Sequence, residues 1–423
     1  MLQVAKEATY LMKEGKPFFY LGDTCWSAFT NIPDGEWAYY LNKRKAQGFN
    51  VLQINILPQW DASQTELNYE PFKLIDGKWD YFSINESYFE HARSLCQKAK
   101  EQGFELALVV LWSNYVPDTW ASKFYDRGIL KKEALDAYID QVDRTFSDLD
   151  PIYIISGDTD FQSELCESYY IEACAKLKAK APHVLYTTHI KGRYSYIPEG
   201  LEKQLDFLMF QSGHNHKDLS MPYSLAQEMA TKYPGKPLIN AEPCYEEMGY
   251  SGGENGQWTK QDIRRAAYES LLSGAGAGIT YGAAGIYSWH TLLADFASEI
   301  GEGFARPKPW QEALQFPGAW DYGFIHSLWS TYGLYDLVSA QELLAVPNPR
   351  FRISKAHDET ILIYTPYNSE LKLQLDSSLY EGIAIDLENR YVSTLELKAK
   401  EFGTYIEKTY FHNDVFYILK RKK

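Results

Sequence analysis

Long apolar runs, export signals and clustered cysteines are all missing from this sequence. No stretch reaches the roughly 18 apolar residues of a membrane-spanning helix. The N-terminal segment lacks the apolar core and small-residue cleavage site of a signal peptide. The 5 cysteines are odd in number, scattered and without a C-x-x-C pair, as is typical of reduced thiols. These absences predict a cytoplasmic protein without a membrane partner.

Positive charge and cofactor motifs are also scarce. The 42 lysines and arginines stand against 56 aspartates and glutamates, and the formal net charge of -14 disfavours nucleic acid as a partner. The glycines of "SGAGAGITYGAAG" follow a helical segment and precede a strand, the reverse of a dinucleotide site, and no G-x-S-x-G occurs. We therefore expect neither a cofactor nor a serine nucleophile.

Aromatic residues, by contrast, are abundant: 33 Tyr, 21 Phe and 11 Trp. Their rings either fill a large core or stack on the apolar faces of sugars, with their polar tips free to form hydrogen bonds. Composition alone leaves both readings open. The 423 residues exceed one typical domain, which favours a large domain followed by a small one.

The apolar pattern alternates between short strand-like runs and amphipathic helical segments. Runs that are apolar throughout, separated by helices, are typical of parallel strands in an α/β fold. Eight such units predict a (β/α)8 TIM barrel over residues 1–345, with a final helix at 324–344. The eight runs span 17–23, 49–56, 104–112, 152–158, 184–190, 205–214, 237–243 and 277–285.

After residue 345 the pattern changes to short alternating strands with no helical period. Residues 346–423 are therefore predicted to form a small antiparallel β-sandwich domain, which we expect to buttress the barrel.

The active site of a TIM barrel lies at the carboxyl ends of its strands. Two acids, Asp158 after the fourth strand and Glu242 after the seventh, are expected to lie across the barrel mouth from each other. Glycosidic bond cleavage needs such a pair, one protonated acid and one carboxylate, with environments that separate their pKa values. The other strand-end residues expected to bind substrate are Asp23, Trp26, Asn55, Trp60, Trp112, His189, Arg193, Gln211, His214, Tyr281 and Trp289.

The sequence leaves alternatives for the roles of these two acids. Tryptophan and tyrosine neighbours would keep Asp158 protonated, whereas donors such as Asn240, Tyr281 or Arg193 would keep Glu242 ionised. Each acid taken alone also suits a helix N-terminus, and Asp160 competes with Asp158 for the acid role.

Histidines raise a metal-dependent alternative, because H-x-H at a strand end is a zinc pattern. Here the pair formed by His214 and His216 follows the sixth strand, whereas metal-dependent amidohydrolases carry theirs on the first. We therefore expect no metal, and treat His189 and His214 as hydrogen-bonding partners of sugar hydroxyls.

Seven ordered motifs carry a family resemblance: "YLGDTCW", "GFNVLQINI", "IISGDTDF", "HIKGRYS", "DFLMFQSGH", "LINAEPCYE" and "YGAAGIYSWH". Together they resemble the apiosidase-like glycoside hydrolases, a branch of the retaining TIM-barrel glycosidases, over roughly residues 5–340. The small β-domain resembles the family's C-terminal domain, of a type labelled collagen-binding.

The resemblance implies that Asp158 is the general acid/base and Glu242 the nucleophile. It also implies that Gln211, Ser212, His214, His189 and Arg193 line the sugar subsite. We accordingly expect a retaining glycoside hydrolase acting on plant-derived or branched oligosaccharides. The alternatives are a non-catalytic carbohydrate-binding barrel and a metal-dependent hydrolase.

Overall fold

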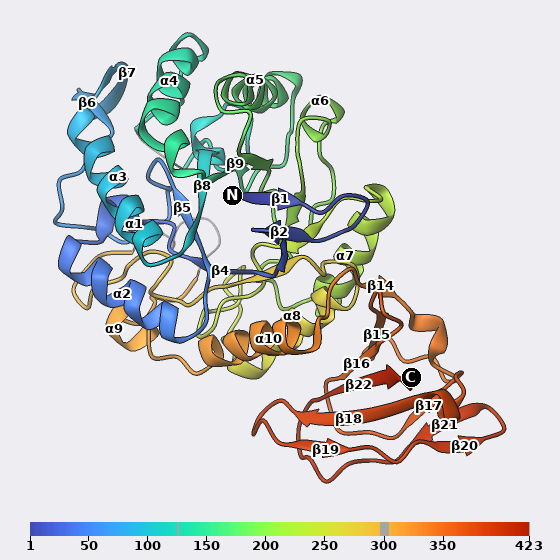
Figure 1. Ribbon diagram of the computed structural model, residues 1–423. Coiled ribbons are helices and arrows are strands. Elements are labelled where there is room, and N and C mark those ends of the chain that lie inside the picture. The colour runs from blue at the N-terminus through green and yellow to red at the C-terminus, as the bar shows by residue number, and fades with distance from the viewer. Residues whose placement is uncertain (125–126, 297–303, 423) are drawn as a thin grey trace.

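A computed structural model describes residues 1–124, 127–296 and 304–422 of the chain. Its main body is a barrel of eight parallel strands surrounded by helices (Figure 1). Seven strands lie within predicted apolar runs and β4 extends one residue beyond the first run, which confirms the TIM-barrel prediction. The strands are β4 (Tyr20–Thr24), β5 (Val51–Asn55), β8 (Glu105–Trp112), β9 (Ile152–Gly157), β10 (Leu185–Thr187), β11 (Leu208–Phe210), β12 (Leu238–Asn240) and β13 (Gly278–Tyr281).

The sheet runs in the order β10-β9-β8-β5-β4-β13-β12-β11, so β10 and β11 stand at its two ends. Individual contacts join these ends into a ring. The main-chain N–H of Asp206 donates to the carbonyl of Tyr186 at 2.9 Å, and the Tyr186 N–H donates to the Asp206 carboxylate at 2.7 Å. Further along, the N–H of Arg193 donates to the carbonyl of Gln211 at 2.8 Å. We call this junction of β10 and β11 the seam.

Six amphipathic segments form the long helices that the sequence predicts around the barrel. Side-chain caps mark two of their starts: Ser163 caps one helix, and Thr259 forms a capping box with Asp262 at another. The six are α2 (Asp34–Ala46), α3 (Glu86–Glu101), α4 (Leu135–Phe146), α5 (Glu164–Lys180), α7 (Met221–Lys232) and α8 (Lys260–Leu271). Shorter helical turns are α1 (Ala28–Asn31), α6 (Glu199–Glu202), α9 (Trp310–Ala313), η1 (Ser113–Tyr115), η2 (Lys132–Ala134) and η3 (Ser147–Leu149).

The final barrel helix, α10, spans Gly318–Tyr332, so the predicted range of 324–344 is wrong at both ends. Gly333 ends the helix in a left-handed conformation with φ 68°, where glycine meets no steric penalty. The chain then continues into β14 (Val338–Ser339) and η5 (Gln341–Leu343).

Two small sheets of the first domain escaped prediction. β1 (Leu2–Val4), β2 (Leu11–Lys13) and β3 (Lys16–Phe18) form an antiparallel sheet, and β6 (Phe72–Ile75) pairs with β7 (Lys78–Ile84). Because β3 leads directly into β4, the N-terminal sheet lies at the amino ends of the barrel strands, where β1 and β2 cross the barrel in Figure 1. The carboxyl ends remain open on the opposite face.

The C-terminal region consists of antiparallel sheets with a hydrophobic core of their own, as the β-sandwich prediction requires. The six-stranded sheet takes in β14, which precedes the predicted boundary at residue 346. Its remaining strands are β15 (Arg352–Lys355), β16 (Ile361–Thr365), β18 (Tyr380–Asp386), β19 (Val392–Thr394) and β22 (Val415–Arg421). A second sheet contains β17 (Leu371–Leu373), β20 (Lys398–Lys400) and β21 (Gly403–Ile406), and η6 (Ser377–Leu379) precedes β18.

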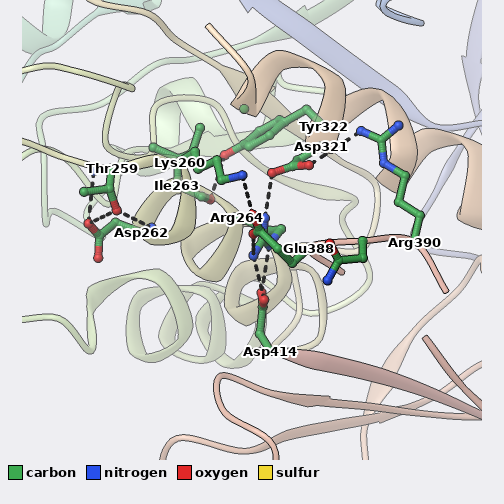
Figure 2. A network of polar contacts seen from close by, with 12 residues as sticks. Thr259, Lys260, Asp262, Ile263, Arg264, Asp321, Tyr322, Glu388, Arg390 and Asp414 are labelled. Atoms are coloured by element: carbon green, nitrogen blue, oxygen red, sulfur yellow. Dashed lines mark hydrogen bonds and ion pairs between the residues drawn. The ribbon is translucent and has the colours of Figure 1, made fainter. Parts of the chain in front are cut away.

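A buried arginine joins the two parts of the chain (Figure 2). Arg264 on α8 is 1% exposed and donates to both carboxylate oxygens of Asp414, at 2.8 and 2.6 Å. Its remaining contacts reach Asp321 on α10 at 2.7 Å and Glu388 of the C-terminal domain at 2.9 Å. The small domain is therefore fixed to the outer helices of the barrel. Within the described residues, no helix combines the length and the apolar character needed to cross a membrane.

Candidate active site

A pocket of about 110 Å³ opens at the carboxyl ends of the barrel strands. It gathers polar and aromatic side chains from loops that are far apart in the sequence. Eight of the predicted site residues line it: Trp26, Trp60, Trp112, Asp158, Arg193, Gln211, His214 and Glu242.

Glu242 follows β12 and is only 7% exposed. Nε2 of His214 lies 2.9 Å from its Oε1, and Nε2 of His189 lies 3.1 Å from its Oε2. Burial by itself raises the pKa of this carboxyl, but the interactions with His189 and His214 outweigh it, so the pKa of Glu242 is lowered to about 2. Glu242 is therefore a carboxylate at neutral pH although it is buried.

Asp158 comes directly after β9 and faces the same pocket. Its main chain is in the left-handed region, with φ 50°, a conformation that aspartate adopts more readily than most residues. Nε2 of Gln211 donates to Oδ1 of Asp158 at 3.1 Å and also to Oε2 of Glu242 at 3.3 Å. Because both contacts share one nitrogen, the distance between the two carboxylate oxygens cannot exceed the sum of these two distances.

The competing acid, Asp160, has a different environment. It is 3% exposed, and its Oδ2 accepts from Gln162 at 2.6 Å and from Lys191 at 3.2 Å. It is not among the residues that line the pocket. Of the two acids after β9, the one that faces Glu242 is Asp158.

Five residues expected to bind substrate are not among those that line the pocket: His189, and four others for which the structure corrects the expectation. Asp23 is fully buried and pairs with Arg44 of α2 at 2.7 Å. The hydroxyl of Tyr281 donates to Glu246 at 2.6 Å, and the indole of Trp289 donates to Glu36 at 2.7 Å. Asn55, also buried, donates to Gln59 at 2.7 Å.

The alternation of side chains along a strand explains two of these corrections. Successive residues of a barrel strand point alternately into the barrel and toward the helices. On β4, Tyr20 donates across the barrel interior to Gln53, whereas Asp23, three positions later, contacts α2. On β13, Thr280 also reaches Gln53, and the next residue, Tyr281, points the opposite way. A strand-end position therefore does not by itself place a side chain in the pocket.

Both predicted histidines contact Glu242. His189 is completely buried, and its Nδ1 accepts the main-chain N–H of Asp158 at 3.2 Å. His214 lines the pocket, so its binding of sugar hydroxyls stays a prediction. Of the expected donors to Glu242, Asn240 donates instead to Ser212 and Ser270, and Tyr281 donates to Glu246.

Sequence reasoning missed several pocket residues, among them Tyr245 and Trp120. Tyr245 is three positions after Glu242; its hydroxyl accepts from the indole of Trp26 at 3.0 Å, and its ring lies edge-on to His214. Trp120, from the irregular segment after β8, donates from its indole to the main-chain carbonyl of Asp158 at 2.7 Å. Neither residue lies at a strand end, so the strand-end rule could not find them.

The H-x-H pair does not assemble a metal centre in the described part of the chain. His216 stacks on Tyr250 with ring centroids 4.1 Å apart, while His214 contacts Glu242. No group of three or more His, Cys, Asp or Glu side chains is suitably placed for a metal ion among these residues.

Comparison with known proteins gives the family. The family described as "Apiosidase-like, catalytic domain" matches residues 5–336, most of the chain. The chain belongs to the apiosidase-like family. It is therefore a glycoside hydrolase, as predicted, with a carbohydrate as its class of substrate. No curated protein matches it.

Solved structures of glycoside hydrolases have the same fold as this apiosidase-like chain. A protein described as a glycoside hydrolase aligns with a TM-score of 0.82 at 23% identity, over 99% of this chain and 96% of its own. A glycoside hydrolase family 5 protein from Bacteroides vulgatus aligns with a TM-score of 0.83 at 22% identity, over 99% and 93%. A family 30 endoxylanase from Clostridium papyrosolvens is more distant, with a TM-score of 0.51 at 10% identity, over 95% and 96%. At these identities the likeness establishes the fold.

Proposed function

We propose that this apiosidase-like protein is a retaining glycoside hydrolase acting on plant-derived or branched oligosaccharides, with Glu242 as nucleophile and Asp158 as general acid/base. The observation that carries the proposal is the single amide nitrogen of Gln211, which contacts both carboxylates at 3.1 and 3.3 Å. Those lengths keep the two oxygens closer together than the ~6.5 Å lower limit of inverting enzymes. A separation below that limit favours a direct attack by Glu242 over attack by an intervening water molecule.

The reaction takes place in two steps. In the first, Asp158 gives its proton to the departing glycosidic oxygen, the bond from that oxygen to the anomeric carbon breaks, and a Glu242 oxygen forms an ester with that carbon. In the second, the Asp158 carboxylate takes a proton from water, whose oxygen attacks the anomeric carbon. The ester bond breaks and Glu242 leaves as a carboxylate.

The hydrogen bonds around the pair support this division of roles. Nδ1 of His189 accepts a main-chain N–H, so the ring proton is on Nε2, which lies 3.1 Å from the Glu242 carboxylate. His214 supplies a second partner and Gln211 a third, which together stabilise a charged Glu242. Asp158 also accepts from the Gln211 amide. A carboxylate that these donors keep ionised suits the nucleophile, and its partner acid then serves as the proton donor.

Aromatic rings at the pocket supply a means of binding sugars. Trp26, Trp60 and Trp112 line it beside the two carboxylates. Flat rings of this kind stack on the C–H faces of a pyranose or furanose, while polar groups nearby bind its hydroxyls.

The test replaces each acid by its isosteric amide. We expect Glu242→Gln and Asp158→Asn to lower turnover on a panel of aryl glycosides and pectic fragments by orders of magnitude, with unchanged circular dichroism. The matched control is Asp160→Asn, which makes the same chemical change two residues from Asp158 and should keep most activity. If Asp160→Asn abolishes turnover and Asp158→Asn does not, the assignment of the acid is wrong.

Two further readouts separate the alternatives. Proton NMR during hydrolysis should show that the first anomer released has the configuration of the substrate, because two displacements restore it. The inverted anomer would refute the double displacement. Binding of a sugar without turnover by the wild-type protein would instead identify a carbohydrate-binding barrel.

A further inference from the structure

The main chain of Asp158 lies in the left-handed region, with φ 50°, which is less favourable than the usual conformations even for aspartate. Such a conformation is more easily kept where neighbouring groups hold it. The preceding residue is Gly157, and a Cβ there would lie 2.1 Å from the ring of Trp112, so the strand end is also tightly packed. The direction of the Asp158 side chain is thus set by how this turn is held.

Two side chains hold the turn, one from each side. The N–H of Asp158 donates to Nδ1 of His189 at 3.2 Å, and its carbonyl accepts the indole N–H of Trp120 at 2.7 Å. His189 follows β10, whereas Trp120 belongs to the loop after β8, so the two supports come from the strands on either side of β9. The main-chain N–H and the main-chain carbonyl of Asp158 are therefore both hydrogen-bonded to side chains.

Trp120 is itself well supported. Its ring meets Trp60 edge-on with centroids 5.7 Å apart, and the ammonium of Lys191 lies 5.5 Å from its centroid. The side chain is half-buried and lines the pocket. His189 also contacts Glu242, so replacing it would disturb both acids, whereas the indole bond of Trp120 acts on Asp158.

We propose that Trp120 is a positioning residue that holds the main chain of Asp158 through its indole N–H and so directs the acid at the leaving-group oxygen. This inference rests on the proposed function. Proton transfer by a general acid requires hydrogen-bond reach to the departing oxygen, and a misplacement of about 1 Å costs on the order of 100-fold in rate. The effect of losing the indole N–H therefore depends on how much the leaving group needs a proton.

The experiment compares two leaving groups on one sugar. Trp120→Phe keeps an aromatic ring and removes the N–H. The substrates are the phenyl and 2,4-dinitrophenyl glycosides of whichever sugar the wild-type enzyme hydrolyses, and kcat/KM is the readout because it reports the first step. We expect a loss of about 10- to 100-fold on the phenyl glycoside and less than about 2-fold on the dinitrophenyl glycoside, which departs without protonation.

The matched control is Trp37→Phe on α2. Trp37 is buried and its indole also donates to a main-chain carbonyl, that of Leu95, at 2.9 Å, but it is not among the pocket-lining residues. Its loss should leave the ratio of the two kcat/KM values at the wild-type level. Trp120→His, which offers a ring N–H, should recover part of the phenyl glycoside activity. If Trp120→Phe does not fold, the two substrates are compared with Trp120→His instead.

Equal losses on both substrates would overturn the inference, since they would mean that Trp120 shapes or binds rather than positions the acid. An unchanged phenyl glycoside rate would overturn it as well, because the 2.7 Å bond would then have no role in proton transfer. These results differ from a failure of the proposed function. In that case the wild-type protein would hydrolyse no glycoside of the panel, and the inference would fall with it.

Discussion

Replacing Arg264 by methionine tests whether the two parts of the chain are joined mainly by one buried charge. The guanidinium is 1% exposed and serves three carboxylates. Without it, Asp321 retains Arg390 at 3.6 Å and Glu388 retains Lys260 at 2.5 Å. Asp414 is fully buried, and Arg264 is its only ion-pair partner in the described residues. The loss of stability in Arg264→Met therefore comes mainly from leaving the charge of Asp414 buried and unpaired.

The size of the effect follows from that burial. Removing one partner of a buried ion pair leaves an uncompensated charge and costs about 3–5 kcal/mol. We expect a loss of this size in the free energy of unfolding, measured by urea titration with tryptophan fluorescence. The control is Arg144→Met on α4, where the side chain is 60% exposed and the change should cost less than about 1 kcal/mol.

A second substitution makes the reasoning refutable. In the Arg264→Met background, Asp414→Asn removes the stranded charge, so it should restore at least half of the lost stability. If Asp414→Asn instead destabilises the single mutant further, the penalty does not come from an unpaired Asp414. Turnover below the unfolding transition should stay at the wild-type level, because none of these residues lines the pocket.

Two other substitutions test the site. His214→Phe removes a partner that helps hold the pKa of Glu242 at about 2. Activity is present above this pKa and is lost as the pH falls through it. The acid limb of the pH profile of kcat/KM, measured by brief pH jumps, should therefore move up by about one to two pH units in the variant. An acid limb at the wild-type pH would contradict this reasoning. In Gly282→Ala the new Cβ would lie 2.0 Å from the Tyr245 ring, so thermal unfolding should show a loss of about 1–3 kcal/mol alongside reduced turnover. Gly35→Ala on α2 meets no neighbour and should not destabilise; equal effects would refute the packing argument.

The barrel could be predicted because its strands are apolar throughout and its helices are amphipathic. Even β10, β11 and β12, of three residues each, lay within apolar runs long enough to recognise. The N-terminal sheet could not be found in this way, because its strands are equally short and one of them, "KPF", contains a proline. The last helix was misplaced because Gly333 lies inside an apolar pattern that continues beyond it.

Within the site, the sequence could indicate which loops matter but not which way each side chain points. Asp158 and Glu242 were found because acids after buried strands are unusual. Asp23 satisfied the same rule, yet it faces α2, where it pairs with Arg44. The contact of Trp120 with Asp158 joins residues 38 positions apart through a main-chain carbonyl, and such a bond leaves no trace in residue type.

The position of the seam explains why these contacts lie where they do. Asp158 follows β9 and Glu242 follows β12, and between them around the ring lie β10 and β11, the ends of the sheet. There the ring is joined by individual contacts, among them the bond from Arg193 to Gln211, rather than by the paired strands seen elsewhere in the barrel. His189 and Gln211, which follow these two strands, each contact both acids or the main chain that carries them. The spacing of the proposed catalytic pair is therefore set by side chains at the seam, and substitutions that alter it should act on both steps of the reaction together.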